Sequence, residues 1–209
     1  NSSGAQANGH SYDPSISANG RYVAFHSGAT DLVSADSNPW KDVFVHDRLT
    51  GITTRISVDS AGGQGNGDSV NAAISADGRF VAFESVANNL VAADANGAWD
   101  IFVHDLTTGT TERVSIGTSG EANGNCLSLT ISADGRHVAF STDANNLVAG
   151  DLNGRGDIFL RDRTTATTEL ISVDSFAAQG DNHSAYPSIS ADGNAVAFDS
   201  WASNLVSGD

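Results

Sequence analysis

The chain carries very little positive charge. Its 209 residues include 10 Lys and Arg against 25 Asp and Glu, a formal net charge of −15 at pH 7, and Lys41 is its single lysine. A surface with this charge repels phosphate backbones and anionic lipid headgroups. We therefore expect no nucleic-acid partner.

Methionine, paired cysteines and long apolar runs are also missing. The sequence has no Met and one cysteine, Cys126, which cannot form an internal disulfide and stands where the other units have Ser. No apolar run approaches the roughly 20 residues of a membrane-spanning helix, so we expect no membrane insertion. No stretch has a sustained helical period either, which indicates an all-β chain.

One unit is repeated along the whole chain. The strings ISANGRYVAF, ISADGRFVAF, ISADGRHVAF and ISADGNAVAF begin at Ile16, Ile74, Ile131 and Ile189, so successive copies are 58, 57 and 58 residues apart. A period this regular predicts a set of equivalent structural modules.

Each unit contains four β-signals. In the first unit, residues 14–17 lead through an Asn-Gly pair into residues 22–25, and such a pair is a strong hairpin signal because both positions tolerate positive φ. Residues 43–45 are wholly apolar and are predicted to lie in mid-sheet. A fourth strand, rich in β-branched residues, follows the turn at residues 49–51. Four antiparallel strands repeated in tandem are typical of the blades of a β-propeller.

The repeat also resembles a known family. The pattern ISADGRxVAF, followed by NLVxxDxNGxxDIFVxD and TTxRVS, looks like the long-blade bacterial propeller repeats of the TolB-type, WD-like class, over essentially the whole chain. The resemblance implies a bacterial protein, and propellers of this class serve as binding modules, scaffolds and enzyme supports alike. The composition agrees with an extracellular or periplasmic β-protein, and because the sequence has no signal peptide we expect a mature product.

The repeat divides the chain, residues 1–209, into units of a single propeller region. The units span residues 13–70, 71–127 and 128–185, and a half unit spans residues 186–209, where Asp209 aligns with the first acidic residue of the earlier loops. Propellers hold about four to eight blades, because the ring must close to remove its sheet edges. We expect either that the chain belongs to a longer polypeptide or that two copies form a seven-bladed ring as a homodimer.

Loop length indicates which face binds. The turns between first and second strands, and between third and fourth, are minimal, whereas residues 27–41 and 60–71 form long connections on the other face of the disc. Long loops on a rigid scaffold are where binding sites concentrate, so we place any site on this long-loop face.

A repeated Asp-x-Asn-x-x-x-Asp motif on these loops has two interpretations. Carboxylate and amide oxygens at this spacing suit a hard cation such as Ca²⁺. The alternative is structural, because Asp and Asn side chains also hold turns by bonding to their own backbone. The candidate metal ligands are Asp36, Asn38 and Asp42; Asp94, Asn96 and Asp100; and Asp151, Asn153 and Asp157.

Two sets of equivalent polar residues precede or open each innermost strand. Both are predicted to lie near the mouth of the central channel, where differences between units can specialise a blade for a small polar or sugar-like ligand; the alternative is solvated loop residues that vary freely. The first set is His10, Asp68, Asn125 and His183, and the second is Asp13, Asn71, Ser128 and Tyr186.

Three functions remain open from the sequence. The first is a non-enzymatic module that binds a ligand, glycan or protein through the long-loop face, with structural calcium as an option. The second is a structural half-ring that assembles with another chain. The third is a propeller-type hydrolase or lyase, which the absence of a Gly-x-Ser-x-Gly elbow, a spaced Cys/His pair and a phosphate loop disfavours.

Overall fold

The computed structural model describes residues 1–208, and every regular element in them is a β-strand. The first antiparallel sheet has the order β1 (Ser11–Ile16), β2 (Tyr22–Ser27), β3 (Asp42–Asp47) and β4 (Ile52–Arg55). The second contains β5 (Ser69–Ile74), β6 (Phe80–Ser85), β7 (Asp100–Asp105) and β8 (Thr110–Arg113). The third contains β11 (Cys126–Ile131), β12 (His137–Thr142), β13 (Asp157–Asp162) and β14 (Thr167–Leu170), and β15 (Ser184–Ile189) pairs with β16 (Val196–Ser200).

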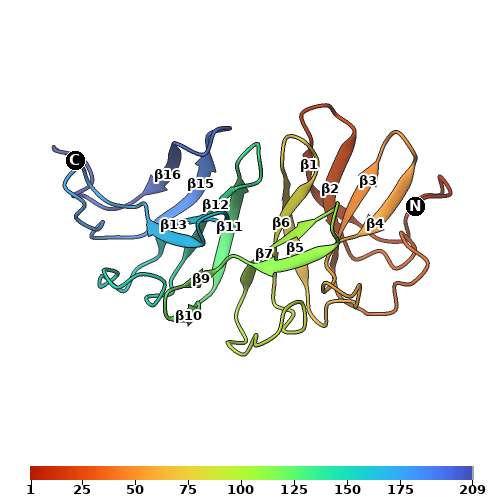
Figure 1. Ribbon diagram of the computed structural model, residues 1–209, viewed down its shortest axis with the longest axis horizontal. Helices are drawn as coiled ribbons and strands as arrows, with labels where there is room; N and C mark the ends of the chain where they lie inside the picture. The colour runs from red at the N-terminus through yellow and green to blue at the C-terminus, as the bar shows by residue number, and fades with distance from the viewer. Residues whose placement is uncertain (209) are drawn as a thin grey trace.

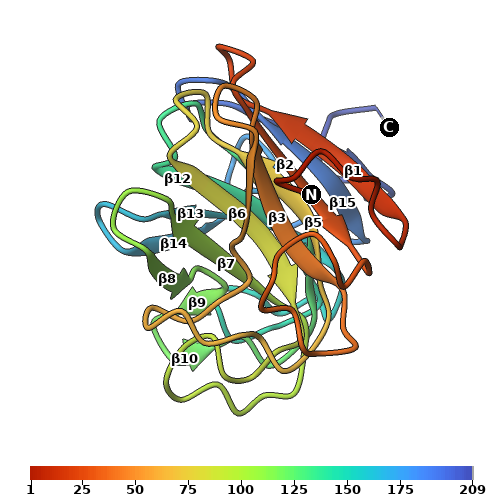
Figure 2. The same cartoon turned by 90° about the vertical axis from the view of Figure 1, so that its right-hand side faces the viewer.

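The sheets fan out like the blades of a propeller. From the red N-terminal sheet to the blue C-terminal pair they follow one another in sequence order, with tight turns along one edge and long loops along the other (Figure 1). The first strands of successive sheets contact one another, β1 with β5, β5 with β11 and β11 with β15. Figure 2 shows β1 and β15 on the same side of the molecule. The predicted all-β propeller of four-stranded blades is confirmed.

The apolar core lies between neighbouring blades. One cluster joins Val43 and Val45 of β3 to Phe83 of β6 and Phe102 of β7, all at most 4% exposed. Within the second blade the Phe83 and Phe102 rings stack, with centroids 5.8 Å apart. Each blade therefore buries its flanks against the next, which explains why the third strand is apolar on both faces.

The tight turns tie each blade to the next. The Ala18 N–H donates to the Ala76 carbonyl, and the same 2.9 Å bond runs from Ala76 to Ala133 and from Ala133 to Ala191. The glycine of each following turn lies under an aromatic side chain of the previous blade: a Cβ on Gly135 would stand 2.2 Å from the Phe80 ring. The Asp-Gly sequence is thus required by packing as well as by backbone conformation.

The long loops are fixed by asparagine side chains. In the second blade the Asn66 N–H donates to Asn89 Oδ1 at 2.9 Å, and Asn89 Nδ2 donates to the Gln64 carbonyl at 2.8 Å. Equivalent bonds join Asn123 to Asn146 in the third blade. The repeated NNL motif therefore braces the two long connections of a blade against each other and makes the long-loop face rigid.

Some features differ from or go beyond the sequence expectations. A short hairpin of β9 (Ile116–Gly117) and β10 (Gly120–Glu121) was not predicted. Among the described residues no helix is long and apolar enough to cross a membrane. Asp209 lies outside the described residues. The unit boundaries and the homodimer stay predictions. In a ring made of two copies, each copy would contribute one two-stranded pair, β15 with β16.

Candidate channel-mouth site

A β-bulge near the start of each innermost strand shapes the channel mouth. The pairing of β1 with β2 shifts register between Tyr12 and Ser15, and the same shift recurs in β5, β11 and β15. One residue in each bulge has positive φ although it is not glycine: Asp13 at 48°, Asn71 at 51°, Ser128 at 54° and Tyr186 at 53°. These four are the second set of polar residues predicted from the repeat. At each bulge this shared conformation turns the side chain away from the direction it would have in a regular strand.

Side chains of the neighbouring second strands hold these bulges. Glu84 of β6, only 2% exposed, accepts the Ser128 N–H on Oε1 at 2.7 Å and the Asn71 side-chain N–H on Oε2 at 2.9 Å. His26 of β2 lies 3.4 Å from the Asn71 nitrogen and 3.7 Å from the Asp13 carboxylate. Burial raises the pKa of Glu84 and lowers that of His26, so both side chains resist charging.

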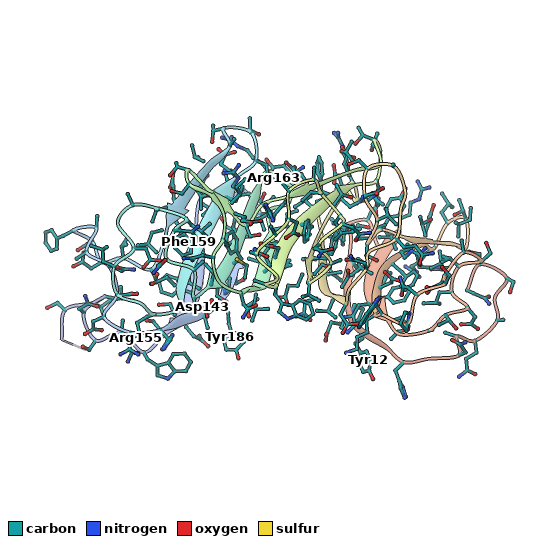
Figure 3. The ribbon with its side chains drawn as sticks, turned by 90° about the horizontal axis from the view of Figure 1, so that it is seen from below. Tyr12, Asp143, Arg155, Phe159, Arg163 and Tyr186 are labelled. Atoms are coloured by element: carbon teal, nitrogen blue, oxygen red, sulfur yellow. The ribbon has the colours of Figure 1, made fainter. Side chains whose placement is uncertain are left out.

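The bulges and Glu84 line an open, shallow cavity of about 240 Å³. Its lining consists of Asn71, Glu84, Ser128, Leu129, Tyr186 and Pro187. The structure thus brings three of the four residues of the second set together. Asp13 lies beside His26, next to the exposed Tyr12. Tyr12 and Tyr186 project along the same edge of the molecule when it is seen from the long-loop side (Figure 3).

Three of the four residues in the first set of polar residues have a structural task. These side chains accept backbone N–H groups. Asp68 accepts that of Lys41 at 2.8 Å, Asn125 accepts that of Trp99 at 3.0 Å, and His183 Nδ1 accepts that of Gly156 at 2.8 Å. Each of these bonds fixes the entry to a third strand. Asn125 and His183 also line a second cavity, of about 310 Å³, with Trp201 at its rim. His10 is exposed, with its ring 6.0 Å from that of Tyr12.

Sequence reasoning missed His26 and Glu84. They occupy equivalent positions at the ends of β2 and β6, where β12 and β16 have Ser141 and Asp199. The sequence did contain a signal that could have identified them. Like the two polar sets, His26 and Glu84 stand at a position where the repeats differ in polar residue type. Strand alternation alone gave no reason to expect that two charged residue types would be buried there.

In the first two blades an arginine lies between the carboxylates of the Asp-x-Asn-x-x-x-Asp motif. Arg55 Nη1 is 3.1 Å from Asp36 Oδ1 and 3.3 Å from Asp42 Oδ2. Asn38 donates to Asp42 at 3.2 Å. The guanidinium group supplies the positive charge that the sequence interpretation assigned to calcium.

The second blade repeats this arrangement with one more acid. Arg113 Nη1 is 3.3 Å from Asp94, 3.5 Å from Asp100 and 2.8 Å from Glu121. Asn96 donates to Asp100 at 2.8 Å. Burial, and then the neighbouring Asp100, raise the pKa of Asp94 to about 6.

The third loop differs, because Leu170 replaces the arginine. There Asn153 donates to Asp157 at 2.9 Å, and the Gln179 amide donates to both Asp151 and Asp157. In residues 1–208 no group of three or more His, Cys, Asp or Glu side chains is arranged to hold a metal ion. Calcium at these loops stays a prediction.

A larger cavity, of about 410 Å³, lies between the first two blades on the tight-turn face. Its lining includes Tyr22, Asp47, Gly78 and Arg79. The charged groups there already have partners, since Arg21 pairs with Asp47 at 2.8 Å and Arg79 pairs with Asp105 at 2.7 Å. This cavity therefore offers a ligand fewer free charged groups than its size suggests.

The fan of four-stranded sheets and the polar mouth on its long-loop side define a β-propeller, and solved structures agree. TolB from Acinetobacter baumannii is 22% identical over 91% of this chain and 37% of its own, with a TM-score of 0.52. A putative TolB from Agrobacterium tumefaciens is 17% identical over 91% of this chain and 59% of its own, with a TM-score of 0.53.

An oligogalacturonate lyase in complex with manganese is 14% identical over 90% of this chain and 46% of its own, with a TM-score of 0.54. The chain thus spans less than two thirds of each of these proteins. No family model and no curated protein matches it. At this identity the likenesses show the fold alone, a β-propeller similar to that of the two TolB structures.

Proposed function

We propose that the chain is a non-enzymatic β-propeller module that binds a small carbohydrate-like ligand at the channel mouth. The observation that carries the proposal is the cavity of about 240 Å³ in which the bulge residues Asn71, Ser128 and Tyr186 meet the buried Glu84. A concave site with a few convergent polar groups is the usual form of a small-ligand pocket.

The chemistry of the lining fits a saccharide. Sugars present hydroxyl groups, which hydrogen bond to carboxylate, amide and hydroxyl side chains, and apolar C–H faces, which pack on aromatic rings. Tyr186 at the cavity is 67% exposed, and Tyr12 is 48% exposed and stacks on His26 with ring centroids 5.4 Å apart. Exposed tyrosines beside buried polar groups provide both kinds of contact.

Backbone conformation supports the same place. Asn71, Ser128 and Tyr186 adopt positive φ, which is costly for residues other than glycine, on the order of 1–3 kcal/mol where the region is sparsely populated. Because three such residues lie around one cavity, the repeat keeps the same backbone conformation there while the side chain differs from blade to blade. Ligand binding would account for keeping a costly conformation at positions with different side chains.

A glycan array followed by calorimetric titration of the best saccharide tests the proposal. We expect Tyr186→Ser to weaken binding about tenfold, since stacking on an aromatic ring is worth roughly 0.5–1.5 kcal/mol beyond burial and the lost burial adds to it. Phe176→Ser is the matched control, because Phe176 is 90% exposed on a loop and outside the cavity.

Equal binding by the wild type and Tyr186→Ser, or no binding to any saccharide, would contradict the proposal. The double variant His10→Ala, His183→Ala tests the first polar set in the same titration. Turnover of the saccharide would place the chain with the hydrolases or lyases instead. A purified protein partner captured at the long loops would favour the protein-binding alternative.

Location and assembly belong to the proposal as well. The low positive charge and the TolB-like fold support an extracellular or periplasmic bacterial setting. Light scattering on the purified chain distinguishes a monomeric module from a half-ring completed by a second copy.

A further inference from the structure

In each of the three full blades two aspartates of the long loop turn their carboxylates toward one point. The first two blades fill this point with an arginine, and the third has none. We infer that the third blade holds a divalent cation, Ca²⁺, between Asp151 and Asp157. This inference is independent of the proposed ligand site.

The strand register identifies the missing partner. Arg55 pairs with Phe44 across β3 and β4, and Arg113 pairs with Phe102 across β7 and β8. The same register places Leu170 opposite Phe159 in the third blade. The side chain that crosses to the acidic loop in two blades is therefore replaced by one that carries no charge.

The acidic pair is nevertheless retained and buried. Asp157 is fully buried, and its Oδ1 accepts the Ser172 hydroxyl at 2.5 Å, as Asp100 Oδ1 accepts that of Ser115. Asp151 is 4% exposed, and in the described part of the chain its Oδ2 has no hydrogen-bond partner. Asp36 Oδ1, at the equivalent position in the first blade, also has no hydrogen-bond partner among the described residues, but it lies 3.1 Å from the positively charged Arg55 guanidinium.

Two carboxylates that share a buried point repel each other unless a positive charge lies between them. At present the Gln179 amide bridges them, with Nε2 2.8 Å from Asp151 Oδ1 and 3.0 Å from Asp157 Oδ2. An amide nitrogen supplies hydrogen bonds and no net charge. The orphaned Asp151 Oδ2 marks where a further positive partner is missing.

The donor set suits calcium. Both carboxylates are hard oxygen ligands, and because the Gln179 oxygen accepts the Leu152 backbone N–H at 3.0 Å, a bound ion would displace the Gln179 nitrogen from between them. Calcium accepts irregular sets of six to eight oxygens and completes them with water.

Thermal unfolding of the whole chain in EDTA and in excess CaCl₂ tests the inference. Calcium is expected to raise the melting temperature of the wild type by on the order of 5 °C at about 100 times the dissociation constant. Leu170→Arg restores the arginine of the other blades. It is expected to melt higher than the wild type in EDTA and to respond no further to calcium.

Two more variants serve as controls. Leu170→Met keeps the position apolar and should retain the calcium response, whereas Asp151→Asn should lose it and melt higher than the wild type in EDTA. A wild type that melts identically in EDTA and CaCl₂ would overturn the inference, since a shared proton would then satisfy the pair. A full calcium response in both Leu170→Arg and Asp151→Asn would also overturn it, because the ion would bind elsewhere.

Discussion

Replacing Arg113 with leucine is expected to lower the free energy of unfolding by about 3–5 kcal/mol, the usual cost of removing one partner from a buried ion pair. The Arg113 side chain is 8% exposed, and its Nη1 contacts Asp94, Asp100 and Glu121. The variant leaves three carboxylates around one vacated point. Denaturant unfolding followed by tryptophan fluorescence measures the loss.

Arg79→Leu is the control for this prediction. Arg79 pairs with Asp105 at 2.7 Å, but its side chain is 44% exposed, so solvent screens the pair and a much smaller loss is expected. Equal losses of unfolding free energy in Arg113→Leu and Arg79→Leu would mean that burial does not make the Arg113 ion pairs more important for stability than an exposed pair. Arg113→Leu also imitates the third blade, so calcium should recover part of its loss if the inference about Asp151 and Asp157 holds.

Gly135→Ala is expected to destabilise the fold by about 2–5 kcal/mol, through two costs of different origin. The φ of Gly135 is 72°, where a Cβ costs roughly 1–2 kcal/mol. The new Cβ would also meet the Phe80 ring of the preceding blade at 2.2 Å, and overpacking of this kind adds about 1–3 kcal/mol.

Gly109→Ala separates the two costs. Gly109 has nearly the same φ, 73°, and no atom lies within 4 Å of the Cβ it would acquire. The difference between the two variants in free energy of unfolding therefore reports the contact between blades alone. Indistinguishable losses would mean that the turn does not pack under Phe80 and that the blades meet differently.

The propeller was predictable because its determinants are local and repeated. The Asp-Gly turn at residues 134–135 sets a hairpin within a few residues, and the period of 57 or 58 residues shows that every unit makes the same one. The clustering of Asn71, Ser128 and Tyr186 also followed from the repeat, because equivalent positions in a propeller surround one axis. Whether they bind a ligand stays a prediction.

Contacts between side chains far apart in the sequence were not predictable in the same way. Glu84 reaches Ser128, 44 positions along the chain, and nothing in the local sequence of β6 indicates that this carboxylate is buried against the next blade. Arg55 likewise lies 19 positions from Asp36, so the acidic motif reads as a metal site until the register of β3 and β4 places a guanidinium in it. The β9–β10 hairpin extends a pairing that the other full blades make as a single bridge, Val58 with Gln64 and Val173 with Gln179.

Nuclear magnetic resonance on the ¹⁵N-labelled chain, titrated with the best saccharide from the array, tests the central claim most directly. The account predicts that the largest amide shifts fall on Asn71, Ser128 and Tyr186, and that Glu84→Gln, which replaces one of the two oxygens that accept the Asn71 and Ser128 N–H groups, reduces them. Shifts confined to the tight-turn face around Gly78 and Arg79, or an unchanged pattern in Glu84→Gln, would contradict it.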